Sequence, residues 1–253
     1  MRIGFIGAGR MGRPMVARLV EAGHDVSALG STAVTEVAEE AKQADVVIVC
    51  VFSDEQVRRV CLDGALLQAM RPRSALVVHT TASPTTMRAI AARAGDVEVV
   101  DAPVSGGPHD IAAGAITLFV GGSDDAVARL RPVLGCYGGP ILHVGPCGAG
   151  QKVKLVNNAL FAGHIGLLAE SIRLGERLGL PESTLLTALP RGSAGSRVLD
   201  IVGARGSIAS FIEVTAEFVG KDVDVVRNMA EELGTELGAL DAAIKAIDVA
   251  GKI

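Results

Sequence analysis

A lysine and two asparagines stand close together in the glycine-rich segment 148–158, which reads GAGQKVKLVNN. If this segment becomes a helix, Asn158 lies four residues after Lys154 on the same face, and Asn157 lies close by. Lysine donates or accepts a proton, and burial lowers its pKa toward neutrality. The spacing therefore predicts a general acid/base beside a carboxamide, acting at a carbonyl or an alcohol. A solvated lysine with a helix-capping asparagine pair is the alternative that this short stretch leaves open.

A glycine-rich turn near the N-terminus supplies a second chemical signal. It has the pattern G-x-G-x-x-G and consists of Gly7, Ala8, Gly9, Arg10, Met11 and Gly12. Apolar patterning predicts a strand over 2–6 before it, and a helix and a strand over 25–29 after it. In that context the first glycine permits the turn, the second admits a pyrophosphate and the third allows close helix packing. The amide groups at the helix start would face the phosphates. We therefore predict a dinucleotide cofactor.

The choice between NAD and NADP is left unresolved by the sequence. An acidic residue after the second strand would hold the ribose hydroxyls, whereas an arginine would favour the extra phosphate of NADP. The chain has Gly30, Ser31 and Thr32 there, with neither residue type. The hydroxyls of Ser31 and Thr32 either donate to a phosphate or belong to an ordinary turn.

Three more strands are expected to end in polar or flexible residues. Strand 45–51 leads to Phe52, strand 75–78 to Thr81, and strand 98–101 to the sequence Ser105-Gly106-Gly107. Ligands of parallel sheets bind at the carboxyl ends of the strands. Thr81 either touches the cofactor or caps the next helix. A hydroxyl followed by exposed amides can hold a carboxylate, although a flexible turn reads the same way.

The pattern of elements predicts an α/β fold: an N-terminal Rossmann-type doubly wound sheet in residues 1–149, followed by a smaller all-α domain in residues 150–253. Strands 115–121 and 139–144 should complete the sheet. One helix over 151–178 is too broadly apolar for a single stripe, so we expect it to be buried on several sides. Because one very buried helix makes up much of the small domain, we expect a homodimer or a homotetramer. The other predicted helices are 33–44, 54–70, one that begins at Ser83-Pro84, 123–134, 182–189, 196–203, 213–233 and 238–252.

Composition excludes several classes of function. The net charge of −4 gives no basic surface for nucleic acid. No apolar run is long enough to span a membrane, the histidines lack metal-ligand spacing, and the four cysteines contain no Cys-x-x-Cys pair. Cys50 should lie in a buried strand. We therefore expect a reduced cytoplasmic protein with free thiols and no metal.

Four ordered stretches that span nearly the whole chain resemble the β-hydroxyacid dehydrogenases, most closely the 3-hydroxyisobutyrate dehydrogenase-like branch. They are GFIGAGRMGRPM from Gly4, DAPVSGG from Asp101, GAGQ from Gly148 with Lys154, Asn157 and Asn158, and Lys221-Asp222.

The resemblance implies a hydride transfer between NAD or NADP and a small β-hydroxy acid or its semialdehyde. It implies that Ser105, Gly106 and Gly107 bind the substrate carboxylate, with Lys154 as acid/base and Asn157 and Asn158 beside the reacting oxygen. Thr81 and the backbone near Val51 and Phe52 would lie along the cofactor, and Lys221 would close over the cofactor or the substrate from the helical domain.

The chain also departs from the family pattern. The segment after Leu29 is short by roughly a helix and a loop, Phe52 stands where proline is frequent, and His79-Thr80 replace a more usual acidic or serine-rich pair. The shortened segment keeps open the alternative of a non-catalytic nucleotide-binding scaffold. As a second alternative, an imine reductase-like enzyme resembles this architecture too. Imine reductases typically replace the lysine, so Lys154 argues against that second alternative.

Overall fold

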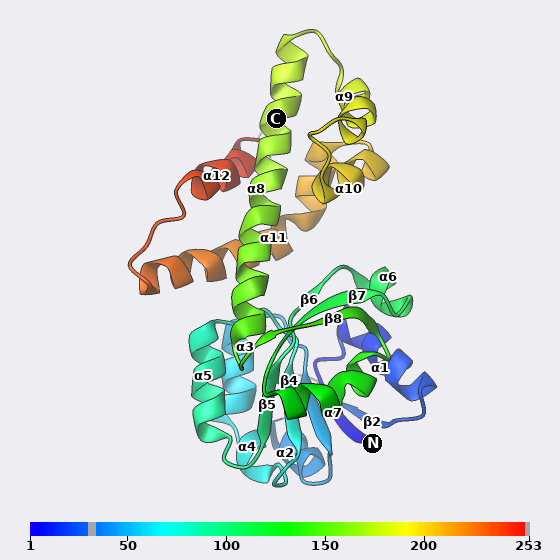
Figure 1. Ribbon diagram of the computed structural model, residues 1–253, viewed down its shortest axis with the longest axis vertical. Helices are drawn as coiled ribbons and strands as arrows, with labels where there is room; N and C mark the ends of the chain where they lie inside the picture. Colours follow the sequence, from blue (N-terminus) through cyan, green and yellow to red (C-terminus); the bar gives the residue numbers. More distant parts are fainter. Residues whose placement is uncertain (30–33, 251–253) are drawn as a thin grey trace. The chain divides into compact units, whose positions relative to one another are not determined.

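The chain forms two compact units. The computed structural model describes residues 1–29 and 34–250, and its contacts divide the chain into Met1–Lys154 and Leu155–Ile253 (Figure 1). The predicted cofactor-binding residue Ser31 lies outside the described residues. In the part of the chain that is described, no helix is both long and apolar enough to cross a membrane.

The first unit is built on a mostly parallel sheet. Its strand order is β2-β1-β3-β4-β5-β7-β6, with β8 paired to β7. The order reverses between β1 and β3, which makes their carboxyl ends the expected dinucleotide crevice. Only the pairs β5–β7 and β6–β7 are antiparallel among those described, so the predicted doubly wound sheet is confirmed with a mixed edge. The strands are β1 Arg2–Ile6, β2 Asp25–Leu29, β3 Val46–Val49, β4 Ala75–Val78, β5 Glu98–Asp101, β6 Val104–Ser105, β7 Ile116–Gly121 and β8 Gly138–Gly145.

Helices cover both faces of this sheet (Figure 1). Alternate strand residues point to opposite sides, so Phe5 packs into one apolar core while Ile6 packs into the other. Because both faces are covered, the central strands β3 and β4 are continuous apolar runs. The first face carries α1 Gly12–Glu21, α6 Pro108–Ala112 and α7 Asp124–Leu134; the second carries α2 Val34–Ala41, α3 Asp54–Arg58, α4 Leu66–Ala69 and α5 Pro84–Arg93.

Two predicted elements of the first unit differ from the structure. The helix expected over 54–70 breaks into α3, a π-helical turn Arg59–Asp63 and α4, with Gly64 in an extended conformation between them. Strand β3 is shorter than expected, because the Thr80 hydroxyl bonds both the amide (2.9 Å) and the carbonyl (3.0 Å) of Val51. Cys50 consequently follows the strand and is only partly buried, contrary to the prediction.

The second unit is all-α, as predicted. It contains most of α8 Ala149–Arg177, then α9 Glu182–Ala188, a 3₁₀ turn Leu189–Arg191, α10 Arg197–Arg205, α11 Ile208–Glu232 and α12 Ala239–Ala250. Helix α11 begins five residues before the predicted 213, because the Ser207 side chain caps it by accepting from the amide of Ser210.

The expectation that α8 is buried on several sides is confirmed for part of its surface, because its residues enter three separate apolar clusters. One face of α8 packs into the helical core through Ile165 and Ile172. Another face is exposed, with Leu167 55% and Leu174 57% accessible. The remaining members of this exposed stripe are Val156, Leu160 and Leu178.

The start of α8 is held to the sheet by a buried carboxylate. Asp101, at the end of β5, is fully buried and accepts hydrogen bonds from the amides of Gly148 (2.5 Å) and Gln151 (2.7 Å). These amides belong to the helix N-terminus, where donors lack partners within the helix and negative charge is stabilised. Asp101 therefore caps α8 from a distant part of the sequence.

The side chain of Gln151 adds two more bonds. Its amide oxygen accepts from the Ala82 N–H (2.9 Å), and its nitrogen donates to the Thr80 carbonyl (2.8 Å). Gly150 lets the helix approach closely, since a Cβ there would lie 2.3 Å from the Phe119 carbonyl oxygen. The first turn of α8 is thus fixed against β4, β5 and β7.

A methyl group at Gly150 should disturb this contact. We expect Gly150→Ala to lower the free energy of unfolding by roughly 1–3 kcal/mol, as overpacking of a fixed backbone does. Gly220→Ala in α11 is the matched control, because nothing lies within 4 Å of its added methyl. Urea unfolding of both variants measures the difference; equal stability of the two would contradict the close approach of α8.

Candidate active site

The three glycines of the N-terminal turn have different roles. Gly7 has φ +95°, and a Cβ on it would lie 2.3 Å from the Cys50 carbonyl oxygen. A Cβ on Gly12 would lie 2.3 Å from the Gly7 carbonyl oxygen. A Cβ on Gly9 would meet nothing within 4 Å. Gly7 and Gly12 therefore allow the turn to pack against the protein. Gly9 lies on the open side of the turn, where the absence of a side chain fits the close approach of a pyrophosphate.

The other residues of the turn support this arrangement. Met11 packs partly buried against the core, and Arg10 is exposed. The carbonyl of Ala8 accepts from the Arg13 side chain at 3.3 Å. The Gly9 carbonyl accepts from the Arg13 amide (3.0 Å), so α1 starts directly from the turn.

The tip of β3 lies beside this turn. A Cβ on Gly7 would be 3.1 Å from a side-chain methyl of Val51. The Val51 backbone is already bonded to Thr80, and the Phe52 amide donates to the Gln56 side chain (2.8 Å). A ligand would therefore meet side chains here, chiefly the Phe52 ring, which is 42% exposed. Thr81 is buried, one residue beyond the Thr80 clasp.

The predicted carboxylate-binding segment follows β5. Ser105 belongs to β6, where it pairs with Thr117, and its side chain is partly buried. Gly106 has φ +135°, a conformation that favours glycine. The Gly107 amide already donates to the Asp110 carboxylate (2.7 Å), which the sequence did not indicate. The Ser105 hydroxyl remains the group expected to bind a carboxylate.

The predicted acid/base and its companions lie along α8. Lys154, the last residue of the first unit, is buried, and so is Asn158, four residues after it on the helix. Within the second unit, the Asn158 side-chain nitrogen donates to Asp222 (2.7 Å), and its oxygen accepts from Asn157 (3.1 Å). Because a carboxylate only accepts, Asp222 fixes which end of the Asn158 amide faces it.

The predicted cofactor residue Lys221 also belongs to the second unit. Its ammonium group lies 3.0 Å from the Asp222 carboxylate. Sequence reasoning assigned no role to Asp222, although it is part of the Lys221-Asp222 stretch that carries the resemblance.

Burial changes the protonation of groups around the start of α8. It raises the pKa of Asp101 to about 6, although the amides of Gly148 and Gln151 oppose that shift. Burial also raises the pKa of the Cys147 thiol to about 12, with the charge of Asp101 adding to the effect. Cys147 therefore stays protonated at neutral pH and is a poor nucleophile.

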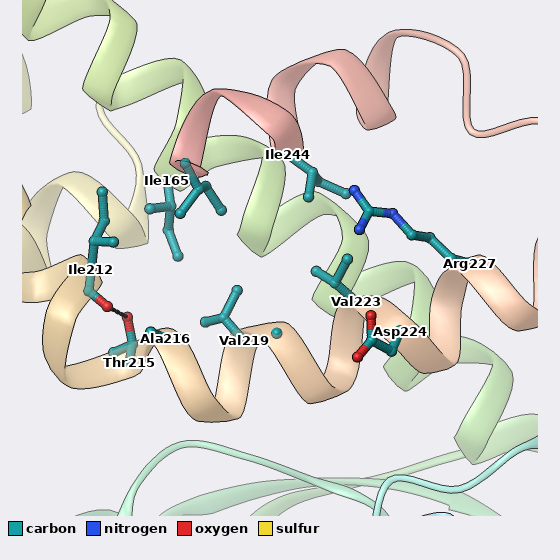
Figure 2. A pocket seen from close by; sticks show the side chains of 11 residues that line it. Ile165, Ile212, Thr215, Ala216, Val219, Val223, Asp224, Arg227 and Ile244 are labelled. Atoms are coloured by element: carbon teal, nitrogen blue, oxygen red, sulfur yellow. Dashed lines mark hydrogen bonds between the residues drawn. The ribbon is translucent and has the colours of Figure 1, made fainter. Parts of the chain in front are cut away.

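A cavity in the helical unit is separate from these residues. It has a volume of about 650 Å³ and is lined by α8, α11 and α12, mainly through aliphatic side chains such as Ile165, Val219 and Ile244 (Figure 2). None of its lining residues is a predicted site residue. Among residues 1–29 and 34–250, no group of three or more His, Cys, Asp or Glu side chains is arranged to hold a metal.

Comparison with known proteins identifies related sequences along nearly all of the chain. Residues 2–145 match the NAD binding domain of 6-phosphogluconate dehydrogenase, and residues 148–252 match the NAD-binding region of NADP-dependent 3-hydroxyisobutyrate dehydrogenase. The NAD-dependent L-serine dehydrogenase of Pseudomonas aeruginosa is 32% identical, over 96% of this chain and 86% of that protein.

Two mycobacterial proteins extend the similarity. A probable 3-hydroxyisobutyrate dehydrogenase of Mycobacterium bovis is 38% identical, over 77% of this chain and 70% of its own length. The solved structure of the Mycobacterium tuberculosis 3-hydroxyisobutyrate dehydrogenase with L-serine superposes with a TM-score of 0.85 and 29% identity. That superposition covers 99% of this chain and 94% of the other.

Because Gly9 and Gly12 have different surroundings, we expect their alanine variants to differ in cofactor binding and in thermal stability. Gly9→Ala should weaken dinucleotide binding at least about tenfold, a loss of about 1.4 kcal/mol, because the methyl fills the open side of the turn. Its melting temperature should stay near that of the wild type. Gly12→Ala should lower the melting temperature instead, since its methyl meets the protein itself. Calorimetric titration with NAD⁺ and NADP⁺ measures the dissociation constants, and thermal unfolding measures the melting temperatures. Undiminished binding by Gly9→Ala would contradict the assignment of this turn as the pyrophosphate site.

Proposed function

The chain belongs to the β-hydroxyacid dehydrogenase family, in its 3-hydroxyisobutyrate dehydrogenase-like branch, and from this we propose that Lys154 is the general acid/base of its reaction. Membership makes the protein an NAD(P)-dependent oxidoreductase of the β-hydroxyacid dehydrogenase type. One observation carries the assignment of Lys154. It is a buried lysine on α8, and the first turn of α8 is held by Asp101, a residue that precedes Ser105 by four positions.

The proposed chemistry divides the work between cofactor and protein. A bound nicotinamide ring supplies the hydride acceptor for oxidation and the hydride donor for reduction. In oxidation, neutral Lys154 takes the proton from the substrate hydroxyl at its Nζ atom, and in reduction its ammonium form returns that proton. The Ser105 hydroxyl donates to the substrate carboxylate and so orients the carbon that reacts. A role for Asn158 in orienting the reacting oxygen and a role for Lys221 in closing over cofactor or substrate are what the family resemblance implies.

The proposed substrate is a small β-hydroxy carboxylate or the matching semialdehyde. The names of the relatives support this class, since L-serine and 3-hydroxyisobutyrate both carry a hydroxyl on the carbon next but one to the carboxyl carbon. A third relative, from Eubacterium barkeri, is named 2-(hydroxymethyl)glutarate dehydrogenase, whose substrate has the same arrangement. The cofactor is NAD or NADP: the L-serine dehydrogenase is named NAD-dependent, and the family that matches residues 148–252 is named for an NADP-dependent enzyme.

Replacing the lysine tests the proposal. Lys154→Ala should lower kcat about 10²–10⁴-fold, the range expected on loss of a general acid/base. Its dissociation constant for NADH or NADPH should change little. Lys152→Ala is the matched control, because Lys152 is an exposed lysine of the same helix and should keep its turnover.

The assay follows reduced-nicotinamide absorbance with a panel of small hydroxy acids and semialdehydes. Unchanged turnover in Lys154→Ala would remove this residue from the mechanism. Nucleotide binding by the wild type without turnover of any substrate in the panel would favour the non-catalytic scaffold instead.

We also propose that the protein self-associates through the exposed stripe of α8. The five residues Val156, Leu160, Leu167, Leu174 and Leu178 are spaced by 4, 7, 7 and 4 positions, which keeps them on one side of the helix. A contiguous apolar surface of this kind commonly marks a protein interface. A second copy of the chain would cover it and give the expected dimer or tetramer.

A charge placed on this stripe should separate the subunits. We expect Leu167→Glu to sediment as a monomer at concentrations where the wild type is a dimer or a larger oligomer, because an ionised side chain is costly to bury. Glu176→Ala, on another side of α8, is the control. Analytical ultracentrifugation gives the masses, and a monomeric wild type would contradict the proposed interface.

A further inference from the structure

A buried histidine joins three parts of the first unit. His79 follows β4 directly and is only 2% exposed. Its Nδ1 lies 2.6 Å from the carbonyl oxygen of Ala102, and its Nε2 lies 2.8 Å from the hydroxyl of Tyr137, which is fully buried. The two rings also meet edge to face, with centroids 5.6 Å apart.

These partners determine the tautomer of the imidazole. A carbonyl oxygen only accepts, so Nδ1 must carry the proton that is donated to Ala102. Nε2 then holds a lone pair and accepts from the Tyr137 hydroxyl. Burial lowers the pKa of His79 to about 4, so the ring stays neutral, with one donor and one acceptor, across the physiological range.

Ala102 is the residue at which the chain leaves β5 toward Ser105. Its amide donates to the carbonyl of Val78 (2.8 Å), and its carbonyl accepts from His79. The next carbonyl, of Pro103, accepts from the amide of Phe119 (3.1 Å). Val104 and Ser105 then pair with β7. Every step from Ala102 to Ser105 is therefore held by hydrogen bonds, and His79 supplies the only side chain among those bonds in the described chain.

We propose that His79, itself oriented by Tyr137, is a positioning residue for carboxylate recognition: by holding the Ala102 carbonyl it sets where the Ser105 hydroxyl and the Gly106 backbone stand. This inference rests on the proposed function, in which Ser105 binds the substrate carboxylate. The inference gives a role to His79, which belongs to the His79-Thr80 pair that departs from the family pattern and to which the sequence assigned no role. A displaced Ser105 hydroxyl would bind the substrate carboxylate less well, so a fixed Ala102 matters for substrate binding.

Three variants separate positioning from general stability. His79→Leu removes both hydrogen bonds and leaves the Ala102 carbonyl without its donor. His79→Asn keeps an N–H close to the position of Nδ1 and loses only the partner of Tyr137. Tyr137→Phe removes a single hydroxyl, and it is the mildest of the three should His79→Leu fail to fold.

The kinetic comparison uses a hydroxy acid and its primary amide, which lacks the carboxylate. His79→Leu should raise KM for the acid at least about tenfold, with a much smaller change for the amide, because only uniform binding of the carboxylate is lost. The NADH or NADPH dissociation constant should stay within about twofold, since the glycine turn is untouched. His79→Asn should have a KM for the acid close to that of the wild type. Tyr137→Phe should show a smaller increase in KM than His79→Leu, and only for the acid. Equal losses for acid and amide, or no recovery in His79→Asn, would overturn the proposal.

Amide hydrogen exchange tests the same claim without turnover. Exchange at Ser105 and Gly106 should quicken at least about tenfold in His79→Leu and much less in His79→Asn, because local opening is easier once the Ala102 bond is gone. Unchanged exchange in His79→Leu would contradict the positioning role even if the wild type proved inactive. Absence of wild-type turnover together with the expected exchange pattern would instead count against the proposed function alone.

Discussion

The contact between the Asp101 carboxylate and the first turn of α8 is the constraint on which the candidate site depends. It places a carboxylate in the interior, where burial disfavours the charged form and raises its pKa, to about 6 once the opposing hydrogen bonds are included. The amides of Gly148 and Gln151 and the positive end of the helix offset part of that cost. The consequence of this arrangement is geometric: Asp101 ends the strand before Ser105 and also caps the helix that carries Lys154.

Similar bonds organise the rest of the first unit: polar side chains at strand ends and at the start of α8 bond to backbone groups near the ends of neighbouring strands. Thr80 clasps Val51 beside the glycine turn, Gln151 holds the segment after β4, and His79 holds Ala102. Each bond fixes a backbone segment that would contact the proposed cofactor or substrate. These interactions lie at the carboxyl edge of the sheet, where parallel strands present their ligands.

Much of this architecture was predictable from local sequence. Strands 2–6, 25–29, 75–78 and 98–101 have the predicted bounds, because short runs rich in apolar residues that are ended by a glycine or a polar residue leave little choice of where a strand ends. The glycine turn was recognisable because strand, turn and helix follow one another within about twenty residues. The π-helical turn after α3 and the early start of α11 were missed, since both depend on details of hydrogen bonding that periodicity does not carry. The cap on α8, the Thr80 clasp and the bond from Asn158 to Asp222 join residues 29 to 64 positions apart, so no local pattern reports them.

The most direct test of the central claim is a crystal structure of the protein with oxidised cofactor and a small β-hydroxy acid. The account predicts the Lys154 Nζ atom within about 2.6–3.2 Å of the substrate hydroxyl, the reach needed for proton transfer, with the Ser105 hydroxyl on the carboxylate. A complex in which the Lys154 amine faces open water, away from both the substrate and Ser105, would contradict it.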